Sequence, residues 1–135
     1  MSDLTQNLQA QVESAFNERR PFNVTSGNSK SFYGREPTGE PLDVSGHQGI
    51  ISYEPSELVV TARCGTRLSE LEATLHEHGQ MLAFEPPHFG DSATLGGTIA
   101  CGFSGPRRPY VGAARDFVLG TQLLNGKGEV LRFGG

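Results

Sequence analysis

The feature that most restricts the fold is the dense placement of glycine and proline in residues 85–116, EPPHFGDSATLGGTIACGFSGPRRPYVGAARD. The whole chain of 135 residues holds 18 Gly and 8 Pro, without repeats or low-complexity tracts. Proline removes a backbone donor and glycine permits conformations that a Cβ forbids, so long regular elements are not expected here. The segment predicts a loop-built site or an irregular fold, with one short helix over residues 95–100.

The N-terminal half carries the patterns of regular elements. Apolar residues at three- and four-residue spacing predict an amphipathic helix over residues 3–20, ended by Pro21. PFNVTS then predicts a short strand that leads into a Gly/Ser loop. Two β-branched runs, 49–55 and 57–66, predict strands joined by a brief turn.

A helix and a further strand are predicted next. Thr66 is placed to cap a helix that ends before Gly79, and residues 80–84, QMLAF, predict a strand. The apolar stripe of that helix would be Leu68, Leu71 and Leu75. After the Gly/Pro-rich segment, apolar alternation about NGKG predicts a C-terminal hairpin. The order of elements predicts an α+β fold with a subdomain boundary near Pro86 and Pro87.

Composition excludes several classes of function. Eleven basic and 15 acidic residues give a net charge of −4, and no Lys/Arg-rich run offers a nucleic-acid footprint. No stretch approaches the roughly 20 apolar residues of a membrane helix, so we expect no membrane insertion and a cytoplasmic protein. Cys64 and Cys101 form no CxxC motif and are expected to be small buried hydrophobes. The four histidines share no metal-ligand spacing, so no metal site is predicted.

The first candidate site is the loop after the N-terminal strand, TSGNSKSFYG at residues 25–34. Backbone N–H groups around Gly27 can turn inward to bind an anion, with serine hydroxyls and Lys30 as further donors. A plain turn explains the same composition, and both interpretations stay open on these residues alone. The loop lacks the GK[ST] spacing of a nucleoside-triphosphate loop.

The second candidate is the glycine pair in SATLGGTIACGFSG, residues 92–105. A helix N-terminus leaves N–H groups exposed, and paired glycines let a pyrophosphate approach the backbone. A tight turn into a helix is the alternative. The spacing of Gly97, Gly102 and Gly105 is not that of a Rossmann fingerprint.

The arginine pair in GPRRPY is a third feature with open interpretations. Arg107 and Arg108 are placed to face a phosphate, a substrate carboxylate or a partner subunit, and a solvated turn explains them equally well.

Taken together, the two loops resemble those of the FAD-binding domain of the p-cresol methylhydroxylase and vanillyl-alcohol oxidase (PCMH-type) family. In that family a small-residue loop and a later Thr-x-Gly-Gly segment grip the FAD pyrophosphate; residues 26–31 match the first and residues 94–97 the second. GNSKSFYGR, the stretch from FEPPHFG to DFVLG, and LRFGG resemble the FAD-binding subunits of bacterial glycolate oxidases. The residues implied to bind FAD are Ser26, Gly27, Asn28, Ser29, Lys30, Ser31, Thr94, Leu95, Gly96, Gly97 and Asp116.

The resemblance implies a PCMH-type FAD-binding domain of two α+β subdomains, 1–84 and 85–135, the second incomplete in this chain. It also implies the N-terminal part of a longer protein, because the family's domain continues past LRFGG. Some relatives attach the flavin through a histidine of the first loop. No histidine lies in residues 26–31, so we expect non-covalent FAD.

The implied activity is oxidation of a small 2-hydroxy acid, glycolate, to glyoxylate by an FAD-dependent enzyme. The implied partners are a second flavin subunit and an iron–sulfur subunit, through which the protein would lie at the inner membrane. No catalytic acid or base is assigned, because those groups would come from the absent part. A non-catalytic flavin- or nucleotide-binding module, or an interaction subunit of a multi-subunit dehydrogenase, remains the alternative.

Overall fold

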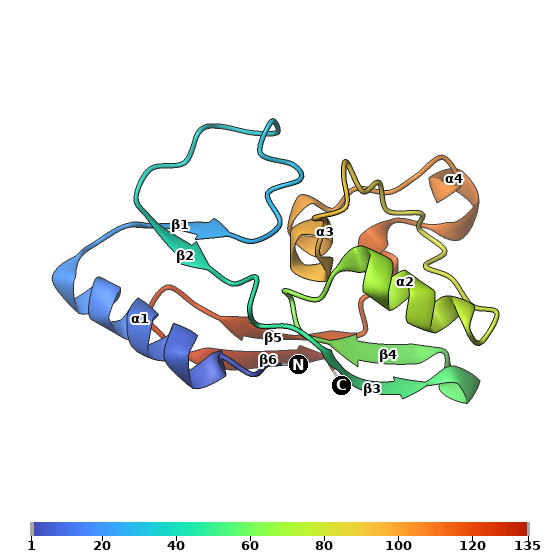
Figure 1. The fold of residues 1–135 in the computed structure, drawn as a ribbon, viewed down its shortest axis with the longest axis horizontal. Coiled ribbons are helices and arrows are strands. Elements are labelled where there is room, and N and C mark those ends of the chain that lie inside the picture. Colours follow the sequence, from blue (N-terminus) through green and yellow to red (C-terminus); the bar gives the residue numbers. More distant parts are fainter. Residues whose placement is uncertain (1, 135) are drawn as a thin grey trace.

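The computed structural model describes residues 2–134 and confirms the predicted α+β class (Figure 1). The helices are α1 (Thr5–Glu18), α2 (Leu68–His76), α3 (Leu95–Cys101) and α4 (Arg108–Val111), with short 3-10 helices η1 (Pro55–Glu57) and η2 (Ala114–Phe117). The strands are β1 (Phe22–Thr25), β2 (Glu40–Asp43), β3 (Ile50–Glu54), β4 (Val59–Ala62), β5 (Gly120–Leu124) and β6 (Val130–Gly134). They form three two-stranded sheets.

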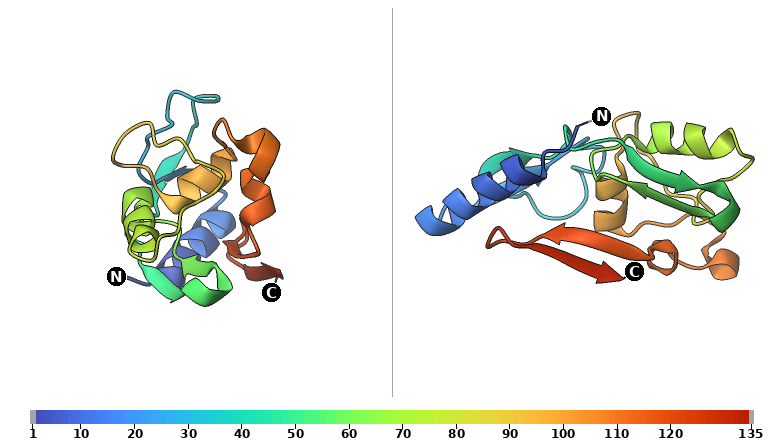
Figure 2. Two further views of the ribbon diagram at one scale, coloured as in Figure 1. Left: turned by 90° about the vertical axis from the view of Figure 1, so that its right-hand side faces the viewer. Right: turned by 90° about the horizontal axis from the view of Figure 1, so that it is seen from below.

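Helix α1 is the predicted N-terminal helix and lies at one end of the molecule, with α2 and the β3–β4 pair at the other end and α3 between them (Figures 1 and 2). Leu8 and Val12 of α1 are buried against Leu42 of β2, and Leu124 of β5 packs on the same cluster. Each such burial contributes about 1.5–3 kcal/mol. This cluster therefore joins the N-terminal helix to strands distant in sequence.

The predicted strand β1 pairs in parallel with β2, which the sequence did not predict. Strand β2 reads EPLD, with a proline and one buried residue, Leu42, so it shows no alternation. The chain between the two strands leaves the carboxyl end of β1 as a long loop that extends toward α3 (Figure 1). That loop contains the first candidate site.

Strands β3 and β4 are antiparallel and lead into α2, which buries the predicted leucine stripe. The predicted cap is wrong: Arg67 is the N-cap residue, and the Thr66 hydroxyl accepts a hydrogen bond of 2.9 Å from the Gly49 N–H instead. Thr66 is fully buried, so its hydroxyl satisfies an interior donor. Gly79 adopts a left-handed φ of 66° after the helix, as its predicted role requires.

The strand predicted at residues 80–84 is wrong, since this segment has no regular structure. The Gln80 side chain accepts a hydrogen bond of 2.5 Å from the Tyr53 hydroxyl and donates one of 2.8 Å to the Pro55 carbonyl oxygen. Phe84 is buried. Backbone hydrogen bonds hold its two ends, from the Gln80 N–H to the Leu75 carbonyl oxygen and from the Gly105 N–H to the Phe84 carbonyl oxygen, and no neighbouring strand pairs with it.

Between Glu85 and Leu119 the chain is mostly irregular, and α3 is confirmed. Helices α4 and η2 are two short elements that the sequence did not predict. The predicted hairpin is confirmed as β5 and β6, and its turn is fixed by the Asn125 side-chain oxygen, which accepts from the N–H groups of Lys127 and Glu129 at 2.9 Å each. No helix within residues 2–134 is long and apolar enough to cross a lipid bilayer.

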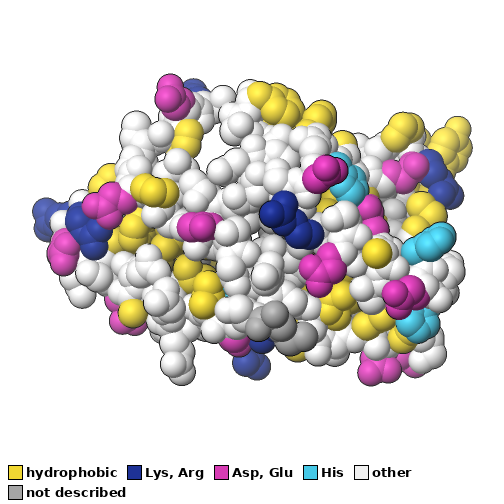
Figure 3. Space-filling view, in the orientation of Figure 1, with side chains coloured by type: hydrophobic (Ala, Val, Ile, Leu, Met, Phe, Trp, Pro, Cys, Tyr) yellow, Lys and Arg dark blue, Asp and Glu magenta, His cyan; other side chains and the backbone are white. Residues whose placement is uncertain are grey.

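Many apolar side chains stay at the surface. Leu58 and Tyr110 are 78% and 90% exposed. Figure 3 shows apolar side chains around α4 and along the upper edge of the loop between β1 and β2. The two cysteines are free and half-buried, so the expectation that both are buried is wrong.

Candidate functional site

The structure brings the two predicted loops into direct contact. A Cβ added to Gly27 would lie 1.6 Å from the backbone oxygen of Ser92, so only glycine allows the two backbones to approach this closely. Beside this contact the Ser26 hydroxyl donates to the Thr94 hydroxyl oxygen at 3.3 Å. Residues 26–31 and 94–97 are here termed the two-loop clip.

The first loop of the clip presents free backbone donors. Asn28 adopts a left-handed φ of 54°, a conformation that asparagine tolerates. The Ser31 N–H donates to the Asn28 carbonyl oxygen at 3.3 Å. Within residues 2–134, the backbone N–H groups of residues 27–30 donate to no other residue. Successive unengaged N–H groups around a left-handed residue are the donor set of an anion-binding nest.

Lys30 is the charged residue of this loop, and it is buried, with 8% of its surface exposed. Its ammonium Nζ lies 3.5 Å from the Ser29 hydroxyl oxygen. No carboxylate among residues 2–134 lies within ion-pair distance of it. Burying an ammonium without a counter-ion costs free energy, and an anion at this loop would offset that cost.

For the second loop the prediction of free N–H groups at the start of α3 is wrong. Each of the first three donates within the protein: Leu95 to the Thr66 carbonyl at 2.9 Å, Gly96 to the Cys64 carbonyl at 2.8 Å, and Gly97 to the Thr94 hydroxyl at 3.2 Å. The first two bonds anchor α3 to the turn before α2, and the third caps α3. The free backbone donors of the clip therefore come from the first loop.

The glycine pair has two separate roles. A Cβ at Gly96 would lie 2.7 Å from the Cys64 Cβ, so Gly96 is needed for packing within the protein. A Cβ at Gly97 would meet only the Thr94 hydroxyl oxygen, at 3.2 Å. A side chain at Gly97 would therefore crowd the Thr94 hydroxyl, which caps α3 and accepts the hydrogen bond from Ser26. Burial raises the pKa of the Cys64 thiol, which keeps this neighbour of the clip uncharged.

Asp116 lies on η2, and no described hydrogen bond or ion pair connects it to either loop of the clip. Its carboxylate Oδ2 accepts a hydrogen bond of 2.7 Å from the Ala113 N–H. Gly112, at a left-handed φ of 101°, begins the same turn. In the structure, Asp116 therefore stabilises this turn. Its contact with FAD stays a prediction.

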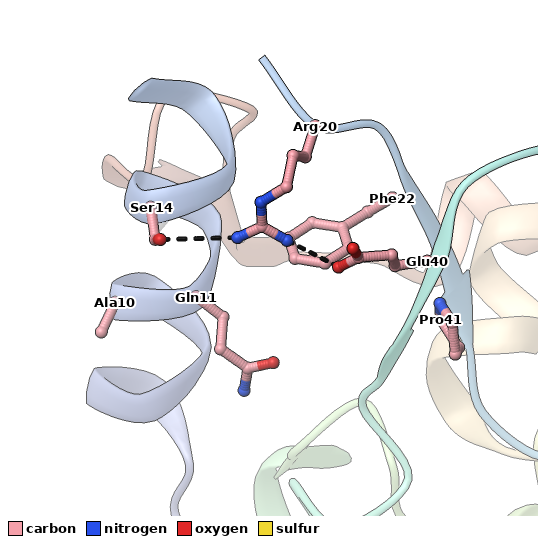
Figure 4. A pocket seen from close by; sticks show the side chains of 7 residues that line it. All are labelled: Ala10, Gln11, Ser14, Arg20, Phe22, Glu40 and Pro41. Atoms are coloured by element: carbon pink, nitrogen blue, oxygen red, sulfur yellow. Dashed lines mark hydrogen bonds and ion pairs between the residues drawn. The ribbon is translucent and has the colours of Figure 1, made fainter. Parts of the chain in front are cut away.

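Two cavities lie outside the clip. One of about 340 Å³ separates α1 from the β1–β2 pair (Figure 4), and the Arg20 guanidinium there is paired with the Glu40 carboxylate at 2.6 Å. The other, of about 400 Å³, adjoins the C-terminal end of α3. Neither is lined by a residue of the clip. Within residues 2–134 no group of three or more His, Cys, Asp or Glu side chains could hold a metal ion.

Both loops were predicted from the sequence, but three of the contacts that the clip makes were not. Ser92, Cys64 and Thr66 contact it through backbone oxygens, and backbone contacts leave no signature in residue type. The burial of Lys30 was missed for a related reason, because it depends on packing between segments distant in sequence.

Comparison with known proteins places this geometry in a family. A family model described as "FAD binding domain" matches residues 4–134. The chain is 53% identical over 133 residues to the glycolate oxidase subunit GlcE of Escherichia coli (strain K12), covering 98% of this chain and 38% of that protein. It is 29% identical over 117 residues to a D-lactate dehydrogenase of Archaeoglobus fulgidus, covering 85% of this chain and 26% of that one. The chain thus spans well under half the length of these relatives.

Solved structures share the fold at low sequence identity. The grass-pollen allergen Phl p 4.0202, described as a glucose dehydrogenase, superposes with a TM-score of 0.80 at 17% identity, over 98% of this chain and 28% of its own. An alkyldihydroxyacetonephosphate synthase superposes with a TM-score of 0.75 at 19% identity, over 95% of this chain and 24% of its own. The family match and these superpositions confirm the predicted PCMH-type fold, and this chain belongs to the FAD binding domain family.

Proposed function

We propose that this chain is the N-terminal, pyrophosphate-binding part of an FAD-dependent subunit of a glycolate oxidase, which oxidises glycolate to glyoxylate. The observation that carries the proposal is the backbone contact between Gly27 and Ser92, which joins two loops into one clip. The identity of 53% to E. coli GlcE supports the choice of enzyme within the family.

The residues of the clip fit a pyrophosphate. The unengaged N–H groups of residues 27–30 supply backbone donors, and the buried Lys30 ammonium supplies a positive charge without an internal partner. The Ser26 and Thr94 hydroxyls hold the loops together, so the donors are fixed before the ligand arrives. Gly97 has no side chain, so it allows a ligand to approach the backbone at the start of α3 closely.

When bound, FAD supplies the hydride-accepting ring for oxidation of the α-carbon of a 2-hydroxy acid. The chain's own residues bind and orient the cofactor. Residues 26–31 contain no histidine, so we propose that FAD is held without a covalent bond. Asp116 remains a proposed FAD neighbour through the turn that it fixes.

A second flavin subunit and an iron–sulfur subunit are the proposed partners, and the proposed location is cytoplasmic, or peripheral at the inner membrane through those partners. The proposal follows from the similarity to a glycolate oxidase subunit.

The test is glycolate-dependent dye reduction by the full-length flavoprotein with its partner subunits. Glycolate should reduce the dye in preference to D-lactate and glucose, the substrates named for more distant relatives. Turnover with D-lactate or glucose and none with glycolate would overturn the substrate assignment. Acid precipitation should release the yellow flavin into the supernatant, and colour retained on the protein would disprove non-covalent binding.

A further inference from the structure

The cavity of about 400 Å³ beside α3 is an unassigned feature with a distinctive lining. Its size falls within the range of ligand pockets, about 300–1,000 Å³. The residues that line it come from α3 and its C-cap and from the segment that holds α4 and η2. They are Ile99, Gly102, Arg108, Ala113, Ala114, Arg115 and Val118.

The charged side chains of this cavity are both cationic. Arg108 lies on α4 and Arg115 on η2, and neither has a carboxylate within ion-pair distance among residues 2–134. The nearby Asp116 does not line the cavity, and its carboxylate accepts from the Ala113 N–H. Arg108 and Arg115 are both exposed, and in a chain with a net charge of −4 two arginines without a carboxylate partner give this cavity a local positive charge.

The rest of the lining is apolar and well fixed. Ala113 and Ala114 are buried, and the Ala114 N–H donates to the Ser104 hydroxyl at 3.0 Å. Ile99 and Val118 complete the apolar wall. The cavity therefore offers two cationic forks and an apolar surface, which together suit a small organic acid with its carboxylate toward the arginines.

We propose that this cavity binds the carboxylate of a small organic acid through Arg108 and Arg115. The inference rests on the proposed function and names the part of the chain that holds the acidic substrate. The cavity meets the C-terminal end of α3, and the two-loop clip meets its N-terminal end. At 1.5 Å per residue, these ends lie about 10 Å apart along the helix axis.

The arginine next to Arg108 provides a matched control. Arg107 does not line the cavity, and its backbone N–H donates to the Glu85 carboxylate at 3.0 Å. Replacing its side chain removes the same charge from the same turn while leaving that bond and the cavity lining intact.

The experiment measures oxalate binding to the full-length flavoprotein by calorimetry. Oxalate is a two-carbon acid without a C–H bond to oxidise, so binding is separated from turnover. Arg108→Gln and Arg115→Gln should each weaken oxalate binding about tenfold or more, the loss expected for a charge-assisted hydrogen bond, while Arg107→Gln changes it less than about twofold. Arg115→Lys keeps the charge without the fork and should give an intermediate loss.

The FAD content and the thermal melting curve of each variant are measured alongside oxalate binding. Unchanged oxalate affinity in folded Arg108→Gln and Arg115→Gln proteins that retain FAD would overturn this inference and leave the proposed function standing. Loss of FAD from these variants would also overturn it, because the arginines would then serve the flavin phosphates. A wild-type protein without FAD whose oxalate binding still requires both arginines would support the cavity and refute the flavin proposal.

Discussion

Replacement of Gly27 by alanine is the sharpest perturbation of the two-loop clip. The added Cβ would lie 1.6 Å from the Ser92 oxygen, whereas real Cβ contacts are essentially never shorter than 3.0 Å. The two backbones must therefore separate by roughly 1.4 Å, the difference between these values, to relieve the clash. That separation would also break the hydrogen bond of 3.3 Å between Ser26 and Thr94.

The expected cost can be estimated from these two terms. Overpacking costs about 1–3 kcal/mol, and the lost hydrogen bond adds about 1 kcal/mol, for a total of about 2–4 kcal/mol. Once the added Cβ has forced the loops apart, closing them on FAD requires this free energy, so the cost falls mainly on FAD binding. The dissociation constant for FAD should rise roughly 30- to 700-fold.

Fluorescence titration of FAD into the full-length protein measures this effect, with circular dichroism to verify the fold. Gly126→Ala is the matched control, because a Cβ at Gly126 meets no atom within 4 Å. It should bind FAD as the unmodified protein does. A folded Gly27→Ala protein with unchanged affinity would refute the reasoning that the loop contact organises the cofactor site.

Three further perturbations separate ligand binding from stability. Gly97→Ala meets only the Thr94 hydroxyl, so the melting temperature should hold while FAD affinity falls; the reverse pattern would make Gly97 a packing residue. Lys30→Met removes a buried ammonium without a counter-ion, so stability should hold or rise while FAD affinity falls about tenfold or more, and unchanged affinity would exclude a phosphate contact. The His47 Nδ1 accepts a hydrogen bond of 3.0 Å from the Leu4 N–H, and burial lowers its pKa from the ordinary 6.5. The unfolded chain therefore binds more protons as pH falls, so the free energy of unfolding should decrease below about pH 6.5, and the decrease should be smaller in His47→Gln. Urea unfolding at pH 7.5 and 5.5 measures this decrease, and an equal decrease in the two proteins would contradict the prediction.

Elements with strong local patterns were predictable from sequence. The leucine stripe of α2 and the NGKG turn of the hairpin each carry their own signal, and both elements form as predicted. Strand β2 was missed because a proline and one buried leucine give no alternation. The strand predicted at residues 80–84 does not form, although its sequence pattern favours a strand. Its apolar residues follow a strand-like pattern, but Phe84 is buried while Met81 is 57% exposed, and no neighbouring strand pairs with the segment.

The candidate site likewise has features that residue types predict and features that they do not. Residue types identified both loops, because small residues and glycine pairs mark close backbone approach. The pairing of Gly27 with Ser92 and the burial of Lys30 depend on contacts between distant segments, which spacing does not encode. The N–H groups at the start of α3 were predicted to be free, but two of them bond to the chain before α2 and the third to the Thr94 hydroxyl, so the free donors are those of the first loop.

The most direct test of the pyrophosphate clip compares the binding of FAD, FMN and riboflavin to the full-length apoprotein by flavin fluorescence. These ligands share one ring system: riboflavin has no phosphate, FMN has one, and FAD has a pyrophosphate joined to adenosine. A clip built from the N–H groups of residues 27–30 and the Lys30 ammonium should bind FAD far more tightly than FMN, and riboflavin most weakly. Equal affinity for all three flavins would contradict the account, because the protein would then recognise the ring and not the pyrophosphate.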